Sequence, residues 1–283
     1  MSSRRNFLRN AALGAGAAAL YPTLSHGAAA MASPSAKGGF TIGFADYTFR
    51  SFSIPESIKL MQQLGVQALS VKDFHMPLNS TQQQINDVMA QYKAGGIHVY
   101  AVGVIYMKST QDVDRAFNYA RMAGVPLIIG VPEYDLLDYT EKKVKEFNIR
   151  IAIHNHGPQD KLYPGPREVY NKISGRDPRM GLCLDIGHSE RAGEEPAAAV
   201  AKYGKRIYDM HIKDVTKAEN DGQAIPVGRG VIDFQKLVKA LRKANYQGHC
   251  SLEYEKSEKV KTDEIPGMSE SVGYFSGVSK TIL

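Results

Sequence analysis

Eight short apolar stretches, rich in β-branched and aromatic residues, recur from residue 40 onward and are separated by segments of helical periodicity. Each strand–helix unit takes about 30 residues, a length typical of parallel strands joined by a helix. Eight such units favour closure into a barrel over an open sheet. We therefore predict strands at Phe40–Ala45, Ala68–Val71, His98–Val104, Pro126–Val131, Ile149–His154, Met180–Asp185, Arg206–His211 and His249–Tyr254.

The segments between these strands carry helix signals. Apolar residues recur at helical spacing after Pro55, and a Ser/Thr pair opens the predicted helix at residues 81–93. Asp233 stands at the N-cap position of the last predicted helix. The predicted fold class is α/β, a single (β/α)8 TIM barrel that covers residues 38–283. We find no second domain and no low-complexity tract.

The first residues have the features of an export signal. Arg4 and Arg5 stand before Phe7 and Leu8, and an Ala/Gly-rich run follows that is too short and too Ala-rich to cross a bilayer. We predict that residues 1–33 are a twin-arginine signal, cut near residues 28–32, and that the rest of the chain is periplasmic. This route carries proteins that are already folded, often with a metal in place.

The net charge of the whole chain is +6, and removal of the signal, with three arginines and no acid, leaves about +3. This excess is too small to predict nucleic-acid binding, and no basic stripe with interleaved aromatic residues is present. We expect no membrane association after signal removal. Cys183 has the same side-chain parity as Asp185, whereas Cys250 has the opposite parity to Glu253, so the two thiols should face different ways. We therefore predict two buried free thiols rather than a disulfide.

Four of the predicted strands end in side chains that bind metals. His154, Asp185, His211 and Glu253 stand at the carboxyl ends of strands five to eight, the end at which a parallel barrel keeps its functional groups. Two nitrogen and two oxygen donors suit a divalent ion such as Mn²⁺, Mg²⁺, Co²⁺ or Zn²⁺. Water or substrate oxygens would complete its coordination shell.

Further polar residues follow the same strand ends. His156, His188 and Lys213 lie next to the four candidate ligands and, with Glu253, are candidates for proton transfer. A single histidine is more often structural, and Lys213 with Asp214 is equally well explained as a surface ion pair.

Candidates for substrate binding include His188 and residues from other loops. Lys72 and His75 follow the second strand, and Arg229 lies between two glycines. The glycines would let the backbone approach a ligand, but the same segment can be a plain loop before Asp233. His98 and His249 open strands, so we take both as structural.

In their order and spacing, four motifs resemble the xylose isomerase-like TIM-barrel family, the sugar phosphate isomerase/epimerase group. They are Leu184–His188, His211–Asp214, Gly228–Asp233 and Leu252–Glu255. The resemblance runs from about Phe40 to the C-terminus. It implies one divalent metal held by side chains of strands five to eight.

By this resemblance Asp185, His211 and Glu253 match three metal ligands and His188 matches a substrate-binding histidine. The chain departs from the ketose epimerases at strand five, where they have a glutamate and this chain has His154. In those epimerases the two glutamates act as bases on opposite faces of an enediolate, so this chain keeps only one of the pair. Inosose dehydratase-like members, which the chain also resembles, perform elimination.

These observations lead us to expect a metal-dependent enolising enzyme, with lyase or hydratase chemistry favoured over isomerase or epimerase chemistry. Lys213 or a histidine would act as general acid at a leaving group. Export favours a non-phosphorylated keto-sugar, 3-keto-glycoside or cyclitol as the substrate. A non-catalytic periplasmic sugar-binding barrel remains the alternative, while the charge and signal disfavour a nuclease related to endonuclease IV. Whether the chain forms a homo-oligomer stays open.

Overall fold

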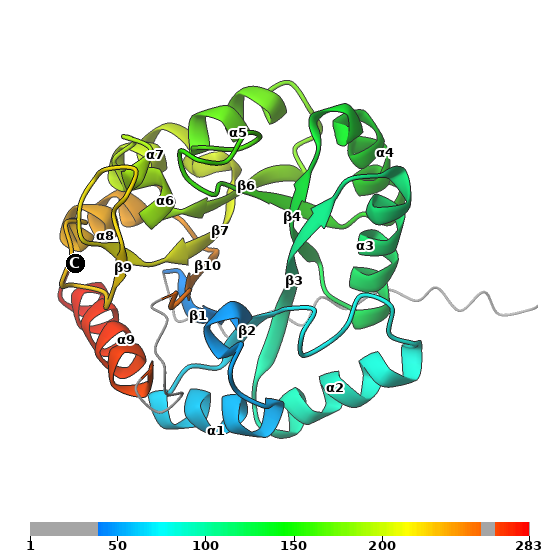
Figure 1. Ribbon diagram of the computed structural model, residues 1–283, viewed down its shortest axis with the longest axis horizontal. Coiled ribbons are helices and arrows are strands. Elements are labelled where there is room, and N and C mark those ends of the chain that lie inside the picture. Colours follow the sequence, from blue (N-terminus) through cyan, green and yellow to red (C-terminus); the bar gives the residue numbers. More distant parts are fainter. Residues whose placement is uncertain (1–38, 256–263, 283) are drawn as a thin grey trace, which may run out of the picture. The chain divides into compact units, whose positions relative to one another are not determined.

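The computed structural model describes residues 39–255 and 264–282, so the predicted export signal lies outside the described residues. Within these ranges eight parallel strands close into a barrel, in the order β1-β10-β7-β6-β5-β4-β3-β2 (Figure 1). The barrel strands are β1 (Thr41–Ala45), β2 (Ala68–Val71), β3 (His98–Met107), β4 (Leu127–Pro132), β5 (Arg150–His154), β6 (Met180–Asp185), β7 (Ile207–Ile212) and β10 (His249–Leu252).

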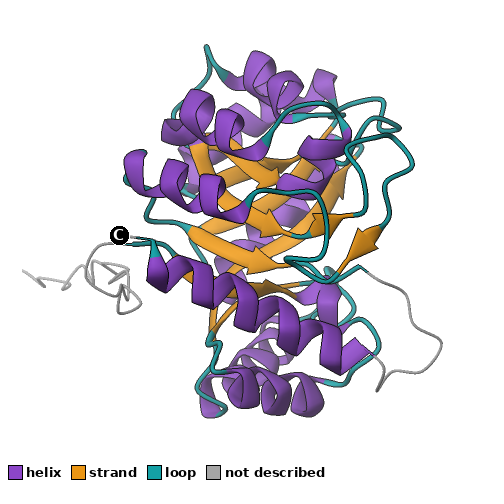
Figure 2. Cartoon of the chain, turned by 90° about the vertical axis from the view of Figure 1, so that its left-hand side faces the viewer, coloured by secondary structure: helices purple, strands orange, loops and turns teal. Residues whose placement is uncertain are grey.

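Helices surround the strands on the outside of the barrel (Figure 2). They are α1 (Ile54–Leu64), α2 (Gln82–Ala94), α3 (Thr110–Ala123), α4 (Leu137–Phe147), α5 (Pro166–Ile173), α6 (Ile186–Arg191), α7 (Pro196–Tyr203), α8 (Phe234–Lys243) and α9 (Glu264–Thr281). In the part of the chain that the structure describes, three short 3₁₀ helices and a small antiparallel pair complete the elements: η1 (Asp46–Phe49), η2 (Tyr134–Leu136), η3 (Gly204–Arg206), β8 (Asp214–Val215) and β9 (Ala224–Ile225).

The predicted barrel is confirmed, and local sequence explains where its helices begin and end. The Thr81 hydroxyl accepts a hydrogen bond from the Gln84 backbone N–H, and Asp233 does the same for Lys236. Gly65 ends α1 in the left-handed conformation, with φ of 67°, which glycine adopts without steric cost. Each predicted strand is observed with its ends shifted by at most three residues.

The barrel strands are buried both on the side that faces the barrel interior and on the side that faces the helices. Every residue of β2, β4 and β6 is buried, as expected for parallel strands with helices on the outside. Cys183 on β6 and Cys250 on β10 are free and buried, and β7 lies between their strands, so the prediction of two buried thiols is confirmed. No helix within the described ranges is long and apolar enough to span a membrane.

The parallel arrangement brings the carboxyl ends of all eight barrel strands to one rim. His154 is the last residue of β5, Asp185 the last of β6, and His211 the penultimate residue of β7. Glu253 follows β10, and its N–H continues the ladder by donating to the Ile212 carbonyl of β7 at 3.0 Å. Strand register therefore sets the relative heights of these four side chains.

Candidate metal centre

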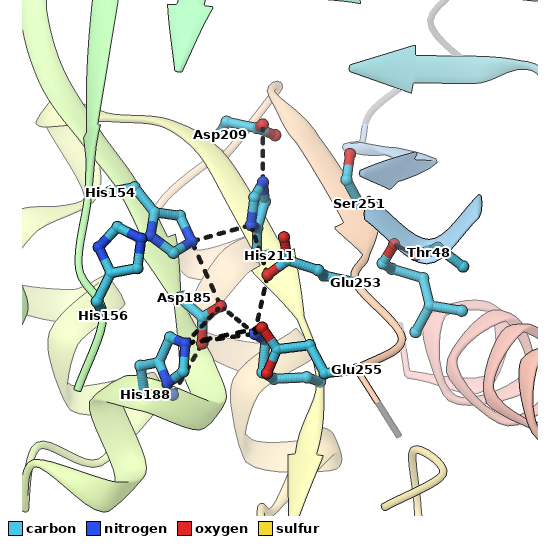
Figure 3. A network of polar contacts seen from close by, with 12 residues as sticks. Thr48, His154, His156, Asp185, His188, Asp209, His211, Ser251, Glu253 and Glu255 are labelled. Carbon is cyan, nitrogen blue, oxygen red and sulfur yellow. Dashed lines mark hydrogen bonds and ion pairs between the residues drawn. The ribbon is translucent and has the colours of Figure 1, made fainter. Parts of the chain in front are cut away.

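The four strand-end side chains converge, as the strand-end argument predicts. His154, Asp185, His211 and Glu253 each offer one ligand atom, these atoms lie within 4.8 Å of one another, and all four residues are buried. Figure 3 shows the four side chains pointing toward one another. We call this group the candidate metal centre.

Distances within the candidate metal centre are those of groups that share one small space. His154 Nε2 lies 3.0 Å from His211 Nδ1 and 3.5 Å from Asp185 Oδ2. Glu253 Oε2 lies 3.1 Å from His211 Nδ1. Asp185 Oδ2 is buried and makes no hydrogen bond of good geometry within the described structure. Two imidazoles and two carboxylates in one buried space fit a single divalent ion.

Hydrogen bonds to both its backbone and its side chain fix the position of Asp185. It caps α6, where its Oδ1 accepts a hydrogen bond of 2.8 Å from the His188 N–H, and this leaves Oδ2 facing the cluster. The side chain of Asn155 bridges β5 and β6: its amide donates to the Asp185 carbonyl at 3.1 Å and its oxygen accepts from the Asp185 N–H at 3.0 Å. The oxygen that would meet an ion is thus oriented before any ion binds.

Lys213 lies inside the cluster rather than on the surface. Its Nζ is 2.8 Å from each of Asp185 Oδ2, Glu253 Oε2 and Glu255 Oε1. The side chain of Lys213 is 3 % exposed. From the sequence, a surface ion pair between Lys213 and Asp214 is an equally good explanation, but the structure does not show this pair. Asp214 instead accepts hydrogen bonds from the backbone N–H groups of Gly228 and Gly230 and so shapes that loop.

Electrostatics keep the carboxylates of Asp185 and Glu253 charged. Burial raises the pKa of Asp185, but His188 and Lys213 together outweigh it and hold this pKa below its ordinary value. Burial likewise raises the pKa of Glu253, and Lys213 and His211 bring it well below the usual range. Burial lowers the pKa of Lys213, but the charges of Asp185, Glu253 and Glu255 have the larger effect and hold this pKa well above its ordinary value. The ammonium and these two carboxylates are therefore ionised at neutral pH.

The two other histidines of the cluster are neutral at pH 7. Burial, helped by His154, lowers the pKa of His156 to about 3. Burial and the nearby cations lower the pKa of His188 well below its usual value, although Asp185 acts in the opposite sense. A neutral imidazole can accept a proton, although so low a pKa makes it a weak base, and both residues stay candidates for the general base that the sequence predicts.

Contacts orient these two rings. The Tyr106 hydroxyl, at the end of β3, lies 2.8 Å from His156 Nε2. Arg191 Nη2 lies 2.5 Å from His188 Nδ1, and the other nitrogen, Nε2, is 3.5 Å from Lys213 Nζ. His156 and His188 thus line the same side of the cluster, with ring centroids 6.2 Å apart.

The predicted substrate-binding residues on the β2 side are engaged elsewhere. His75 Nδ1 lies 2.8 Å from Asp46 Oδ1, and its Nε2 contacts the Phe52 carbonyl at 2.7 Å. Lys72 Nζ donates to the Val104 carbonyl at 2.9 Å and pairs with Asp73. This arrangement favours a supporting role for both, and their binding of substrate stays a prediction.

Arg229, the remaining predicted substrate-binding residue, lies on the surface. Its side chain is 62 % exposed, and its Nε pairs with Glu270 of α9 at 2.5 Å. Gly228, which precedes it, has φ of 94° and packs against the ring of Tyr274. The loop therefore packs against α9, and contact of Arg229 with a substrate also stays a prediction.

Several residues of the cluster were not predicted as site residues. Glu255 follows Glu253 by two positions and so lies on the same side of the chain, a parity signal that could have identified it. Asp209 precedes His211 by two positions on β7. Its Oδ2 lies 3.9 Å from His211 Nε2 and accepts a hydrogen bond of 2.9 Å from the Tyr100 hydroxyl. Burial raises the pKa of Asp209 to about 7, against the opposing effects of His211 and Tyr100.

A closed (β/α)8 barrel with a cluster of metal-binding side chains at its carboxyl rim defines the class of this protein. The model of one family, described as xylose isomerase-like TIM barrel, matches residues 58–276, and the chain belongs to that family. The resemblance seen in the four sequence motifs is thereby confirmed.

Relatives of known name share parts of this barrel. An inosose dehydratase from Clostridium botulinum (strain Eklund 17B / Type B) is 28 % identical over 151 residues, which are 45 % of this chain and 49 % of the relative. The chain thus matches about half the length of that relative.

Two solved structures share the fold at low identity. A crystal structure of IOLI protein with a binding zinc atom has a TM-score of 0.74 at 16 % identity and covers 86 % of this chain and 99 % of its own. The 3-keto-D-glucoside 4-epimerase from E. coli has a TM-score of 0.66, also at 16 % identity, and covers 84 % and 99 %.

Proposed function

We propose that this chain is a divalent-metal-dependent enzyme that enolises a non-phosphorylated keto-sugar or 3-keto-glycoside, with lyase or hydratase chemistry favoured. One observation carries the proposal. The four donor atoms of the candidate metal centre lie within 4.8 Å of one another, next to neutral His156 and His188 and the charged Lys213. Ligands, bases and an acid at one rim are the parts that such a reaction needs.

An ion held by His154, Asp185, His211 and Glu253 would act as a Lewis acid that polarises a substrate carbonyl. His156 or His188, both neutral, would accept the proton from the carbon next to that carbonyl. Glu253 is the remaining candidate base from the sequence, but its Oε2 already pairs with Lys213 at 2.8 Å. The two histidines are therefore the stronger candidates in this structure.

Elimination needs a proton at the departing group, and the cluster holds a charged donor for it. Lys213 Nζ is 3.5 Å from His188 Nε2, so an acid and a base stand side by side. His154 occupies the strand-five position, and its pKa is lowered mainly by burial, so it is neutral rather than a second carboxylate base. The similarity to an inosose dehydratase supports the same preference.

Sugar isomerisation or epimerisation is the alternative reaction. It uses the same first step and differs only in where the proton returns. Similarity in fold to the 3-keto-D-glucoside 4-epimerase is compatible with either reaction. From the predicted export signal we further propose that the protein works in the periplasm. Sugar phosphates are scarce there, which favours a non-phosphorylated substrate.

Incubation with a panel of keto-sugars and 3-keto-glycosides in D₂O, read by NMR, tests the reaction class. We expect release of water or an aglycone from a metal-loaded sample. Deuterium incorporated beside the carbonyl without loss of any group would instead assign an isomerase or epimerase. If neither change occurs with any substrate, the proposal of an enolising enzyme fails.

A sugar-binding barrel without catalysis remains a second candidate, and metal analysis separates it from an enzyme. The enzyme should purify with, or take up, about one equivalent of divalent ion. His154→Glu provides a further check, because it restores a carboxylate at strand five. We expect this variant to keep its metal and to show no gain in elimination.

A further inference from the structure

The ammonium of Lys213 lies where the carboxylates of the candidate metal centre meet. It is 2.8 Å from Asp185 Oδ2 and 2.8 Å from Glu253 Oε2. These are the same two oxygens that face the imidazoles, since Asp185 Oδ2 is 3.5 Å from His154 Nε2 and Glu253 Oε2 is 3.1 Å from His211 Nδ1. A divalent ion held by the four residues would therefore need oxygens that Lys213 already pairs with.

The chain is shaped to place the ammonium there. Lys213 follows His211 by two positions, so both side chains leave the strand on the same side. Its stem passes over Gly187 in the first turn of α6, where a Cβ would overlap the Cγ of Lys213. A glycine at this position thus leaves the space that the lysine stem fills.

The surrounding carboxylates explain why a buried ammonium is stable at this point. Asp185, Glu253 and Glu255 bring three carboxylates within 2.8 Å of one point, and Asp185 and Glu253 are almost fully buried. Buried carboxylates without a counter-ion are strongly destabilising. Glu255 is not among the four candidate metal ligands, so it is the partner that Lys213 can keep when the other two turn to an ion.

We propose that Lys213 is an internal cation that competes with the divalent ion: it neutralises Asp185 and Glu253 in the ion-free protein and keeps only Glu255 when the ion binds. The inference rests on the proposed function only in requiring that a divalent ion binds here. Its consequence is an ion affinity lower than the four ligands alone would give. Repulsion between the ion and an ammonium a few ångströms away has the same sign and adds to the effect.

Titration of chelator-stripped protein with Mn²⁺, by calorimetry, tests the proposal without reference to turnover. Lys213→Met removes the charge and keeps the length of the side chain. We expect it to bind Mn²⁺ at least about tenfold more tightly than the unchanged protein. Its melting temperature without metal should fall, and the increase in melting temperature caused by Mn²⁺ should be larger.

Lys217→Met is the matched control. Lys217 is 44 % exposed and pairs with Glu219 and Asp221 on a surface loop, so this variant should bind Mn²⁺ like the unchanged protein. Equal or weaker binding by Lys213→Met would overturn the competition while leaving the metal-dependent function standing. Absence of Mn²⁺ binding in every variant would overturn both.

Failure of Lys213→Met to fold would also be informative. In that case Mn²⁺ is added during refolding, and Lys213→Gln, whose amide still donates hydrogen bonds to the carboxylates, is titrated in parallel. Recovery of the fold by Mn²⁺, or tighter binding by Lys213→Gln, supports the proposal because the ion then replaces the missing ammonium. Variants that stay unfolded in saturating Mn²⁺ contradict it.

Discussion

Two polar clusters lie at the same rim of the barrel and differ in how completely their groups are paired. On the β1–β3 side, His75 contacts Asp46 and the Phe52 carbonyl, and Asp46 also accepts from the Lys72 N–H at 2.9 Å. On the β5–β10 side, the three carboxylates of Asp185, Glu253 and Glu255 share the ammonium of Lys213, which lies 2.8 Å from an oxygen of each.

This difference separates support from function. A fully satisfied buried network rigidifies the loops that carry it and offers nothing to a ligand. Buried carboxylates that outnumber their counter-ions cost free energy, and natural proteins keep such groups where a ligand or ion can neutralise them. We therefore expect the β1–β3 cluster to support the fold, and we propose the candidate metal centre as the place where an ion and substrate bind.

The sharpest test of this contrast is Asp185→Asn, and it carries the largest expected effect. The amide keeps the hydrogen bond that caps α6 but removes the charge that faces the cluster. We expect Mn²⁺ affinity to fall at least about 100-fold and turnover to be lost, with little change in melting temperature. Asp87→Asn, an exposed carboxylate on α2, is the control. Unchanged turnover in Asp185→Asn would remove the basis of the metal assignment.

On the other side of the rim, His75→Ala should act on stability rather than on the site. It breaks contacts with Asp46 and Phe52 and removes the imidazole that faces the buried carboxylate of Asp46, which costs about 3 kcal/mol. Urea unfolding measures this loss, while Mn²⁺ affinity should stay the same. Phe74→Ala, at an adjacent residue that is 40 % exposed, serves as control. A loss of substrate affinity with unchanged stability would restore the substrate-binding role.

The sequence predicts the barrel well because period and composition carry it. Alternation of apolar strands with helical segments gives all eight strands, and their last residues give the candidate ligands. Helix α9 was not predicted, because glycines at positions 267, 273 and 277 and several serines weaken its periodic pattern. Local propensity thus fails where packing against the barrel decides the structure.

Within the site, the sequence could not separate residues that look alike. His75 and His188 both follow strand ends. Only three-dimensional contacts show that the ring of His75 faces a carboxylate and a carbonyl oxygen, whereas the ring of His188 faces the cations of Arg191 and Lys213. The burial of Lys213 depends on three carboxylates and on the space above Gly187, which come from separate parts of the chain. Local sequence patterns do not predict contacts between residues that are far apart in the chain.

Strand β3 contacts both clusters, and Tyr106→Phe tests the contribution of its contact with the candidate metal centre. Lys72 reaches the Val104 carbonyl on this strand, and the Tyr106 hydroxyl contacts His156 Nε2 at 2.8 Å. Removal of the hydroxyl keeps the stacked ring but frees the imidazole to turn, so we expect turnover to fall by about three- to tenfold. Metal affinity and melting temperature should not change. Full activity would show that His156 is not the oriented base.

His249 lies at the amino end of the barrel and, unlike the histidines of the two clusters, has no counter-ion among the described residues. Its replacement should have the smallest effect of these substitutions. It stacks on Tyr100 with ring centroids 3.5 Å apart, and burial, with His98 and Arg150 acting in the same sense, lowers its pKa to about 4. The folded protein therefore takes up this proton less readily than the unfolded chain, whose histidine pKa is about 6.5. The stabilisation is complete above pH 6.5 and is lost as the pH falls toward 4.

His249→Gln should remove this pH dependence. Between pH 7.5 and pH 5 we expect the unchanged, metal-free protein to lose about 1 kcal/mol more stability than the variant, a value reduced for the partial exposure of the ring. Urea unfolding at the two pH values measures the difference. His75, whose pKa is raised because Asp46 outweighs its burial, should show the opposite slope, with stability lost as the pH rises through its folded-state pKa. Equal slopes for the His249 variant and the unchanged protein would mean that the ring is protonated as easily in the barrel as in water.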